Sequence, residues 1–313
     1  QADDILLLST SPEGLQSKLD SLASWCLRNG LAVNVSKSFL LAFGPLPLAL
    51  PRITLYGERL QLTDCTAYVG VLLATSKRNV YANHRVSQAK KVRAVANSTL
   101  GVEGLIGPIP PFFARKLYNA RIHPHLISAC VVDLDVNTAD LRELEDVQNT
   151  FARRMSRLPA HTQILPVLMD LGLRPLRYAR MLAVLVLLEG LVTTAPVVPR
   201  AALACSVALA RRGQRSWAGD LHHALKALPV PVQWDYRATP TVDRVRDARK
   251  RVLESLLQCA QACISGSTKL ALWKWGVMPA IARRPTLDDL FKLRPYTAIA
   301  RISHRRNVAR LLA

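Results

Sequence analysis

Apolar residues follow two different patterns along the chain, and the change comes near residue 80. Before it, short apolar runs alternate with turn-forming residues, which predicts short strands around one helix. After it, apolar residues recur every three or four positions over long stretches, which predicts amphipathic helices. The expected fold class is therefore α+β at the N-terminus and mainly α beyond it, divided into residues 1–80, 81–160 and 161–313.

The first part is expected to hold one helix among short strands. Residues 5–8 form an unbroken aliphatic run, which predicts a buried strand. Ser11 and Pro12 are suited to begin a helix, and Asn29 with Gly30 to end it. Further strands are predicted over 31–34 and 39–43, in a hairpin over 53–62 around Gly57, and over 68–73.

The second part is predicted to be a series of helices, over 82–102, 110–130, 138–158, 176–192 and 242–264. In the second of these, the expected apolar face includes Phe112 and Phe113. The third ends in Arg153, Arg154 and Arg157, which suit the negative end of the helix dipole. The Pro- and Ala-rich stretch 193–240 predicts short helices at most, with Trp217 and Trp234 as local core.

No stretch has the pattern of a membrane span or a signal peptide. The most apolar stretch, 181–198, is short for a span and contains Glu189 and Pro196, so a buried helix is expected. Asp3 and Asp4 interrupt any apolar run at the start. The six scattered cysteines are typical of a reduced protein. The expected location is intracellular, in the nucleus or cytoplasm, neither secreted nor transmembrane.

Positive charge is concentrated in the helical part. The chain carries 42 Lys and Arg against 22 Asp and Glu, a net charge of +20, with a pI of about 10.4. Residues 1–80 contribute seven basic and six acidic side chains, so almost all of the excess lies beyond residue 80. This asymmetry predicts an anionic polymer as partner, most simply a nucleic acid. The alternative is a solvated basic surface without a specific partner.

Two adjacent carboxylates at the start of the chain are the candidate catalytic chemistry. Asp3 and Asp4 stand directly before the aliphatic run, and a buried strand can carry them only at an exposed end or at a cation. Two hard oxygen ligands suit Mg²⁺, with Mn²⁺ as a possible substitute. Asp133 and Asp135 also lie close in sequence, but a turn before a helix explains them better than a metal site.

These carboxylates open the first of three motifs that resemble the reverse transcriptases of non-LTR (LINE-like) retrotransposons. Ala2-Asp3-Asp4 with its apolar run is similar to the aromatic-Ala-Asp-Asp box of that family, with Gln1 in place of the aromatic residue. The second motif matches the family's Gly-Leu-x-x-Asn-x-x-Lys segment at Gly30, Leu31, Asn34 and Lys37. The third, Tyr68-Val69-Gly70, resembles the Tyr-Leu-Gly box of the primer-grip hairpin.

The resemblance implies an RNA-directed DNA polymerase that performs two-metal nucleotidyl transfer on an RNA template and a DNA primer. It implies the end of a palm over residues 1–80, followed by a thumb-like helical bundle along the template–primer duplex. Asp3 and Asp4 would hold two Mg²⁺ ions and act in catalysis, and Asn34, Lys37 and Gly70 would lie near the substrate. Phosphate contacts are expected from Lys90, Lys91, Arg93, Arg115, Lys116 and Arg121.

The chain is expected to be a fragment that does not polymerise alone. The family also requires an aspartate on an upstream palm strand and a set of fingers, and neither is found in these residues. The alternative hypothesis is a non-catalytic, basic helical remnant that binds nucleic acid through residues beyond 80. For any single basic residue, a solvated helix face is the simpler interpretation.

Overall fold

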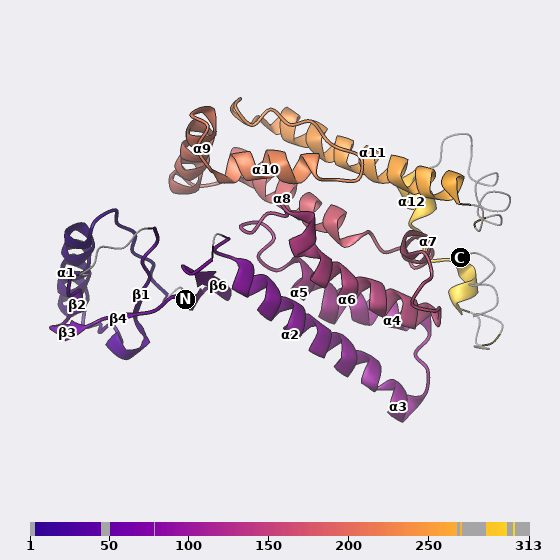
Figure 1. The fold of residues 1–313 in the computed structure, drawn as a ribbon, viewed down its shortest axis with the longest axis horizontal. Helices are drawn as coiled ribbons and strands as arrows, with labels where there is room; N and C mark the ends of the chain where they lie inside the picture. The colour runs from indigo at the N-terminus through magenta and orange to yellow at the C-terminus, as the bar shows by residue number, and fades with distance from the viewer. Residues whose placement is uncertain are drawn as a thin grey trace. The chain divides into compact units, whose positions relative to one another are not determined.

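The computed structural model describes residues 4–44, 51–77, 79–267 and 286–298, together with Leu270 and Ser303. Within these residues the chain is mainly α-helical with a few short strands, in agreement with the predicted fold class at this coarse level. It divides into an N-terminal unit, Gln1–Ser87, and a helical unit, Gln88–Ala313. Figure 1 labels the helices and strands of both units.

Helix α1 (Pro12–Arg28) organises the N-terminal unit and begins and ends where the sequence predicted. The Ser11 hydroxyl accepts a hydrogen bond from the Gly14 amide at 3.1 Å, and Pro12 occupies the first turn. Gly30 follows the helix with a φ of 67°, which a residue without a side chain adopts freely. The buried face of α1 contributes Leu19 to a small core with three residues in and beside the β2–β3 hairpin: Ile53, Leu55 and Leu60.

The described strands of this unit form three separate pairs. They are parallel β1 (Phe39–Leu40) with β4 (Gln61–Leu62), antiparallel β2 (Thr54–Leu55) with β3 (Glu58–Arg59), and antiparallel β5 (Cys65–Tyr68) with β6 (Val71–Ala74). The predicted hairpin around Gly57 is thus confirmed, and residues 68–73, predicted as a strand, belong to a second hairpin that turns at Val69 and Gly70. Both turns place two consecutive residues at positive φ, Tyr56-Gly57 at 53° and 80° and Val69-Gly70 at 48° and 78°, as tight two-residue hairpins require.

The expected strand over residues 5–8 is wrong. This segment has no regular secondary structure, and Ile5 and Leu8 are 57% and 70% exposed. The expected strand over 31–34 is also absent, and the one over 39–43 shrinks to β1. An apolar run predicts burial, but a strand also needs a neighbour to satisfy its backbone groups, and these segments find little or none among the described residues.

The first layer of the helical unit is built on one apolar core. Its helices are α2 (Ala82–Gly101), α3 (Glu103–Ile106), α4 (Pro111–Leu117), α5 (His123–Ile127), α6 (Thr138–Ser156) and α7 (Ile164–Asp170). Val92 from α2, Ile122 and Leu126 from the middle segment and Phe151 from α6 are at most 1% exposed. The helix predicted over 138–158 is confirmed as α6, and its N-cap is Asn137.

The helix predicted over 110–130 is broken in its middle. A π-helical turn, Tyr118–Ile122, separates α4 from α5. Pro124 explains the interruption, because it has no N–H for the carbonyl four residues earlier and its ring crowds the preceding turn. The apolar face is also different from the prediction, because Phe112 and Phe113 are 41% and 55% exposed.

A second layer consists of α8 (Leu176–Thr193), α9 (Val197–Arg211), α10 (Trp217–Lys226), α11 (Val242–Gly266) and α12 (Leu287–Leu290). Helices α8 and α11 lie side by side (Figure 1) and share a core that includes Leu185 and Leu256. The 15-residue α9 contradicts the expectation of short helices only. Its alanines and leucines favour helix, and Pro196 and Pro199 lie at its start, where the missing N–H is tolerated.

The buried amide of Gln148 on α6 joins the two layers. It is 1% exposed and donates to the Tyr118 hydroxyl at 2.8 Å and to the Arg174 carbonyl at 3.0 Å. It also accepts from the Leu176 amide at 2.9 Å, which is the first residue of α8. One side chain thereby fixes the π-helical turn and the start of α8 relative to α6.

Among the residues that the structure describes, no single helix has the length and apolar character needed to cross a membrane. The bent pair α8 and α9 meets that test only when the two are taken together, across an angle of 114°.

Candidate nucleic-acid interface

The residues that the resemblance assigns to the polymerase site lie in different parts of the N-terminal unit. Asp3 lies outside the described residues, and Asp4 is exposed. The Asn34 side chain accepts from the Lys37 amide at 3.2 Å and caps the 3₁₀ turn Val35–Lys37, so these two are brought together. Gly70 is the second residue of the β5–β6 turn. No hydrogen bond or ion pair within the described ranges joins Asp4 to Lys37 or Gly70.

The described residues do not form the expected magnesium site by themselves. They contain no group of three or more His, Cys, Asp or Glu side chains placed to hold a metal ion. Asp4 contributes one carboxylate of the predicted pair, which is too few ligands for an arrangement of two metal ions. Asp135, considered above in a turn, is bound instead to Arg180.

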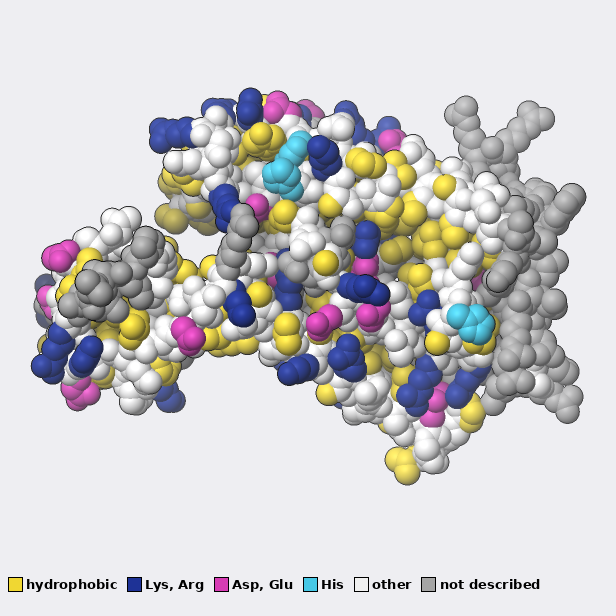
Figure 2. Space-filling model, viewed as in Figure 1, with side chains coloured by type: hydrophobic (Ala, Val, Ile, Leu, Met, Phe, Trp, Pro, Cys, Tyr) yellow, Lys and Arg dark blue, Asp and Glu magenta, His cyan; other side chains and the backbone are white. Residues whose placement is uncertain are grey.

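The basic residues predicted on α2 face solvent. Lys90, Lys91 and Arg93 are exposed, while Ala89 and Val92 between them are fully buried in the core. The helix therefore separates an apolar face from a basic one. Figure 2 shows Lys and Arg side chains recurring across the visible face of the helical unit. Such a face can contact the phosphates of a nucleic acid without reading its sequence.

Lys116 on α4 lies beside two exposed aromatic rings. The Phe112 and Phe113 ring centroids are 5.4 Å apart in an edge-to-face arrangement, and Lys116 Nζ lies 4.5 Å from the centroid of the Phe112 ring. Arg121 in the π-helical turn is exposed as well. Aromatic faces next to basic side chains are the combination on which unpaired bases stack.

Arg115 has a different environment from the other predicted phosphate contacts. It is half-buried, and its Nε has no hydrogen-bond partner among the described residues. Its guanidinium carbon lies so close to Gly172 that a Cβ at that glycine would be 3.4 Å away. This arginine therefore packs against the turn between α7 and α8, which leaves it less accessible to a phosphate than Lys116.

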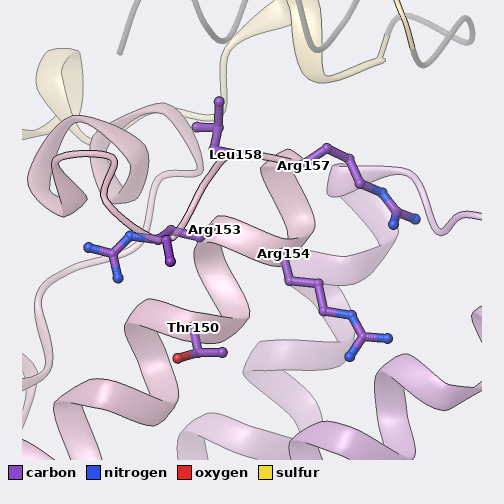
Figure 3. A pocket seen from close by; sticks show the side chains of 6 residues that line it. Thr150, Arg153, Arg154, Arg157 and Leu158 are labelled. Carbon is purple, nitrogen blue, oxygen red and sulfur yellow. The ribbon is translucent and has the colours of Figure 1, made fainter.

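A cavity of about 350 Å³ at the C-terminal end of α6 has three arginines among its lining residues (Figure 3). It is lined by Thr150, Arg153, Arg154, Arg157, Leu158 and Ala160. Arg157 ends the helix in the left-handed conformation, with φ 58° and ψ 36°. In Figure 3 the side chains of Arg154 and Arg157 extend to one side of the cavity and Arg153 to the other.

One carboxylate faces this cluster of arginines. Arg157 Nη2 donates to Glu103 Oε1 at 2.8 Å, whereas Arg154 Nη2 is 3.9 Å from Glu103 Oε2. Glu103, the first residue of α3, also accepts from the Ile109 amide at 3.1 Å, which ties it to the loop after α3. Arg153 donates through Nε and Nη2 to the Thr162 carbonyl at 3.0 and 2.9 Å. The cavity therefore keeps an excess of positive charge.

From the sequence alone, these arginines are expected only to complement the helix dipole. Their spacing carried a further signal, because Arg154 and Arg157 are three residues apart and share a helix face. Glu103 lies some fifty residues earlier in the chain, so the sequence could not pair it with them. Comparisons of the chain with models of protein families, with curated proteins and with solved structures found no match.

Proposed function

We propose that the chain is part of an RNA-directed DNA polymerase of the non-LTR retrotransposon type, and that its helical unit binds the nucleic-acid backbone. The distribution of positive charge along the chain is the observation that supports nucleic-acid binding by the helical unit. Residues 1–80 hold seven basic and six acidic side chains, while the whole chain holds 42 and 22. The excess therefore belongs almost entirely to the helical part, where Lys90, Lys91 and Arg93 are exposed.

Binding of this kind is driven by the release of counterions from the phosphates. Each basic side chain that neutralises a phosphate releases counterions, so affinity falls steeply as salt rises. The exposed rings of Phe112 and Phe113 beside Lys116 add a surface for unpaired bases. A primer–template, which combines a duplex with a single-stranded overhang, offers ligands for both kinds of contact.

Support for the polymerase assignment comes from the order of the three motifs and from local geometry at two of them. Asn34 caps the turn that carries Lys37. Gly70 has a φ of 78° at a hairpin turn, where a residue with a side chain would be strained. The catalytic part of the proposal, with Asp3 and Asp4 as metal ligands, is based on the resemblance alone.

The binding is tested by fluorescence anisotropy of a labelled RNA–DNA primer–template over a series of salt concentrations. Wild-type chain is expected to bind with a steep salt dependence. Changing Lys90, Lys91 and Arg93 to Gln is expected to lower the slope of log K against log salt by about 0.7–0.9 for each phosphate that is no longer neutralised. The matched control changes Arg28, Arg52 and Arg59 of the N-terminal unit to Gln and leaves the slope unchanged.

A weak, salt-independent interaction, or an equal decrease of slope in both triple variants, would overturn the binding proposal. Catalysis is tested separately by primer extension in the full-length polymerase that the resemblance implies. There Asp3→Asn abolishes extension while primer–template affinity stays the same. Extension that persists in Asp3→Asn favours the second candidate, a non-catalytic protein that binds nucleic acid through its basic helices.

A further inference from the structure

Neither the dipole of α6 nor a general basic surface explains why the arginines at the end of this helix line a cavity next to Glu103. Arg154 and Arg157 extend to the same side of the cavity (Figure 3), and their Nη2 atoms lie 3.9 and 2.8 Å from the carboxylate oxygens of Glu103. Guanidinium groups bind carboxylates and phosphates with the same planar fork of N–H donors. The Glu103 carboxylate, bound by Arg157 and near Arg154, therefore marks a position that a phosphate oxygen could also take.

We propose that this cavity binds a phosphate group between Arg154 and Arg157, in competition with the Glu103 carboxylate. The inference deepens the proposed function, because it names one site at which a backbone phosphate is held. The cavity volume of about 350 Å³ is several times the roughly 30 Å³ of one water molecule, so a phosphate has room to enter. Thr150 on the wall offers a hydroxyl that can donate to a phosphate oxygen.

Unequal contacts to Glu103 leave donors free for such a ligand. Arg157 forms a short hydrogen bond, but Arg154 Nη2 at 3.9 Å is beyond hydrogen-bond distance. The Arg154 side chain is 45% exposed, while that of Glu103 is only 13% exposed. Arg154 therefore faces solvent with its donors available, and Glu103 is the one acidic group found to pair with it in the described part of the chain.

Substitutions of Glu103 and of Arg154 are expected to change the affinity for phosphate in opposite directions, which makes the proposal testable. Glu103→Gln removes the competing charge but keeps an oxygen that can accept from the Ile109 amide, so the loop after α3 retains its contact. The variant is expected to bind phosphate more tightly than wild type. Arg154→Ala removes the exposed donor and is expected to bind more weakly. If the cluster only stabilised the fold, Glu103→Gln would not be expected to tighten phosphate binding.

The experiment uses the full chain with two probes, inorganic pyrophosphate in isothermal titration calorimetry and labelled primer–template in anisotropy at fixed salt. Arg154→Ala is expected to weaken binding about fivefold to tenfold, which is within the range of one hydrogen bond at a partly exposed position, and Arg154→Lys to recover part of it. Glu103→Gln is expected to tighten binding about threefold or more, the strength of a modest ion pair. Arg142→Ala, at the exposed start of α6, is the matched control for charge.

The two probes separate the sources of the phosphate. If the Arg154 and Glu103 variants change the affinity for both probes, the cavity binds free phosphate as well as backbone phosphate. If they change the affinity for primer–template alone, the cavity binds only backbone phosphate. The proposal is overturned if Arg154→Ala and Arg142→Ala behave alike with both probes, or if Glu103→Gln fails to tighten binding. Failure of wild-type chain to bind primer–template contradicts the general binding proposal instead, and pyrophosphate then still tests the cavity.

Discussion

Arg180 and Asp135 form a two-pronged ion pair in the interior of the helical unit. Arg180 Nε donates to Asp135 Oδ2 at 2.8 Å and Nη2 donates to Oδ1 at 2.9 Å, and the Arg180 side chain is 2% exposed. The remaining nitrogen, Nη1, donates to the Leu126 carbonyl at 2.8 Å. The pair ties α8 to the segment that joins α5 to α6, where no regular secondary structure holds the backbone.

Removing the charge of Asp135 is expected to destabilise the helical unit strongly. Asp135→Asn leaves the buried Arg180 guanidinium without its anion, which typically costs about 3–5 kcal/mol. Urea unfolding followed by circular dichroism measures the change in the free energy of unfolding. The control is Asp235→Asn, because Asp235 pairs with Arg244 at 3.7 Å at the surface, where such pairs contribute about 1 kcal/mol at most. Equal decreases in both variants would contradict the prediction.

Replacing Gln148 with Leu is expected to destabilise the helical unit, because it removes the hydrogen bonds that join its two layers. The change leaves the Leu176 amide, the Tyr118 hydroxyl and the Arg174 carbonyl without the partner described above. Each unsatisfied buried group costs about 1–3 kcal/mol, so a decrease in stability of at least about 3 kcal/mol is expected from the melting temperature and urea titrations. Gln214→Leu at an exposed position is the control and is expected to change stability little. A stability of Gln148→Leu close to that of the control would show that water replaces the amide.

Asp170 is expected to make stability depend on pH in the mildly acidic range. Burial raises the pKa of its carboxyl to about 6, although the Tyr296 hydroxyl, which donates to Oδ2 at 2.7 Å, and Arg294 lower it. The unfolded value is about 3.9. Because the native state holds the proton more tightly, this contribution to stability is full below about pH 4 and is lost as pH rises through about 6.

The comparison of wild type with Asp170→Asn isolates this effect. The variant cannot ionise, so its stability relative to wild type is expected to rise between about pH 4 and 7, by on the order of 2–3 kcal/mol. Thermal unfolding at several pH values measures the difference, with the exposed Asp288→Asn as control. Parallel pH curves for wild type and Asp170→Asn would show that Asp170 keeps an ordinary pKa in the folded chain.

Phe112 and Phe113 are expected to contribute to binding only where unpaired bases are present. Changing both to Leu keeps an apolar surface but removes the aromatic faces, and stacking is worth about 1–3 kcal/mol for each base. The double variant should bind a single RNA strand more weakly and an abasic strand of equal charge unchanged. Phe43→Leu is the control, because Phe43 is as exposed as Phe113, at 55%. Equal weakening on both strands would indicate a change in charge or fold.

Local signals in the sequence were enough to place α1, α2, α6, α8 and α11, but not α9. Ser11 and Gly30 bounded α1, and the spacing of Val92 and Ala96 identified α2, because capping and amphipathic periodicity act within a few residues. The strand expected over residues 5–8 failed because pairing depends on distant segments. The break before Pro124 was readable from the proline, but the π-helical turn that accommodates it depends on how the surrounding helices pack.

At the candidate site, too, features set by neighbouring residues could be predicted and contacts between distant segments could not. Exposure of Lys90, Lys91 and Arg93 could be predicted, since each lies opposite an apolar face. The inward turn of Arg115 toward Gly172 could not, because that contact joins segments more than fifty residues apart. The pairing of Glu103 with Arg157 is also a product of the tertiary fold, which is why the sequence indicated a dipole effect where the structure has a cavity.

At position 157 the backbone conformation favours glycine, whereas the proposed phosphate binding requires arginine. A helix end in the left-handed conformation is the place where glycine is most favourable, and a residue with a side chain gives up about 1 kcal/mol there. A change to glycine would therefore relax the helix end and remove one of the two arginines proposed to hold a phosphate. In a lineage that no longer needs to hold nucleic acid, drift toward glycine at this position would meet no resistance. The residue found there in related chains thus becomes an indicator of whether the binding function is still under selection.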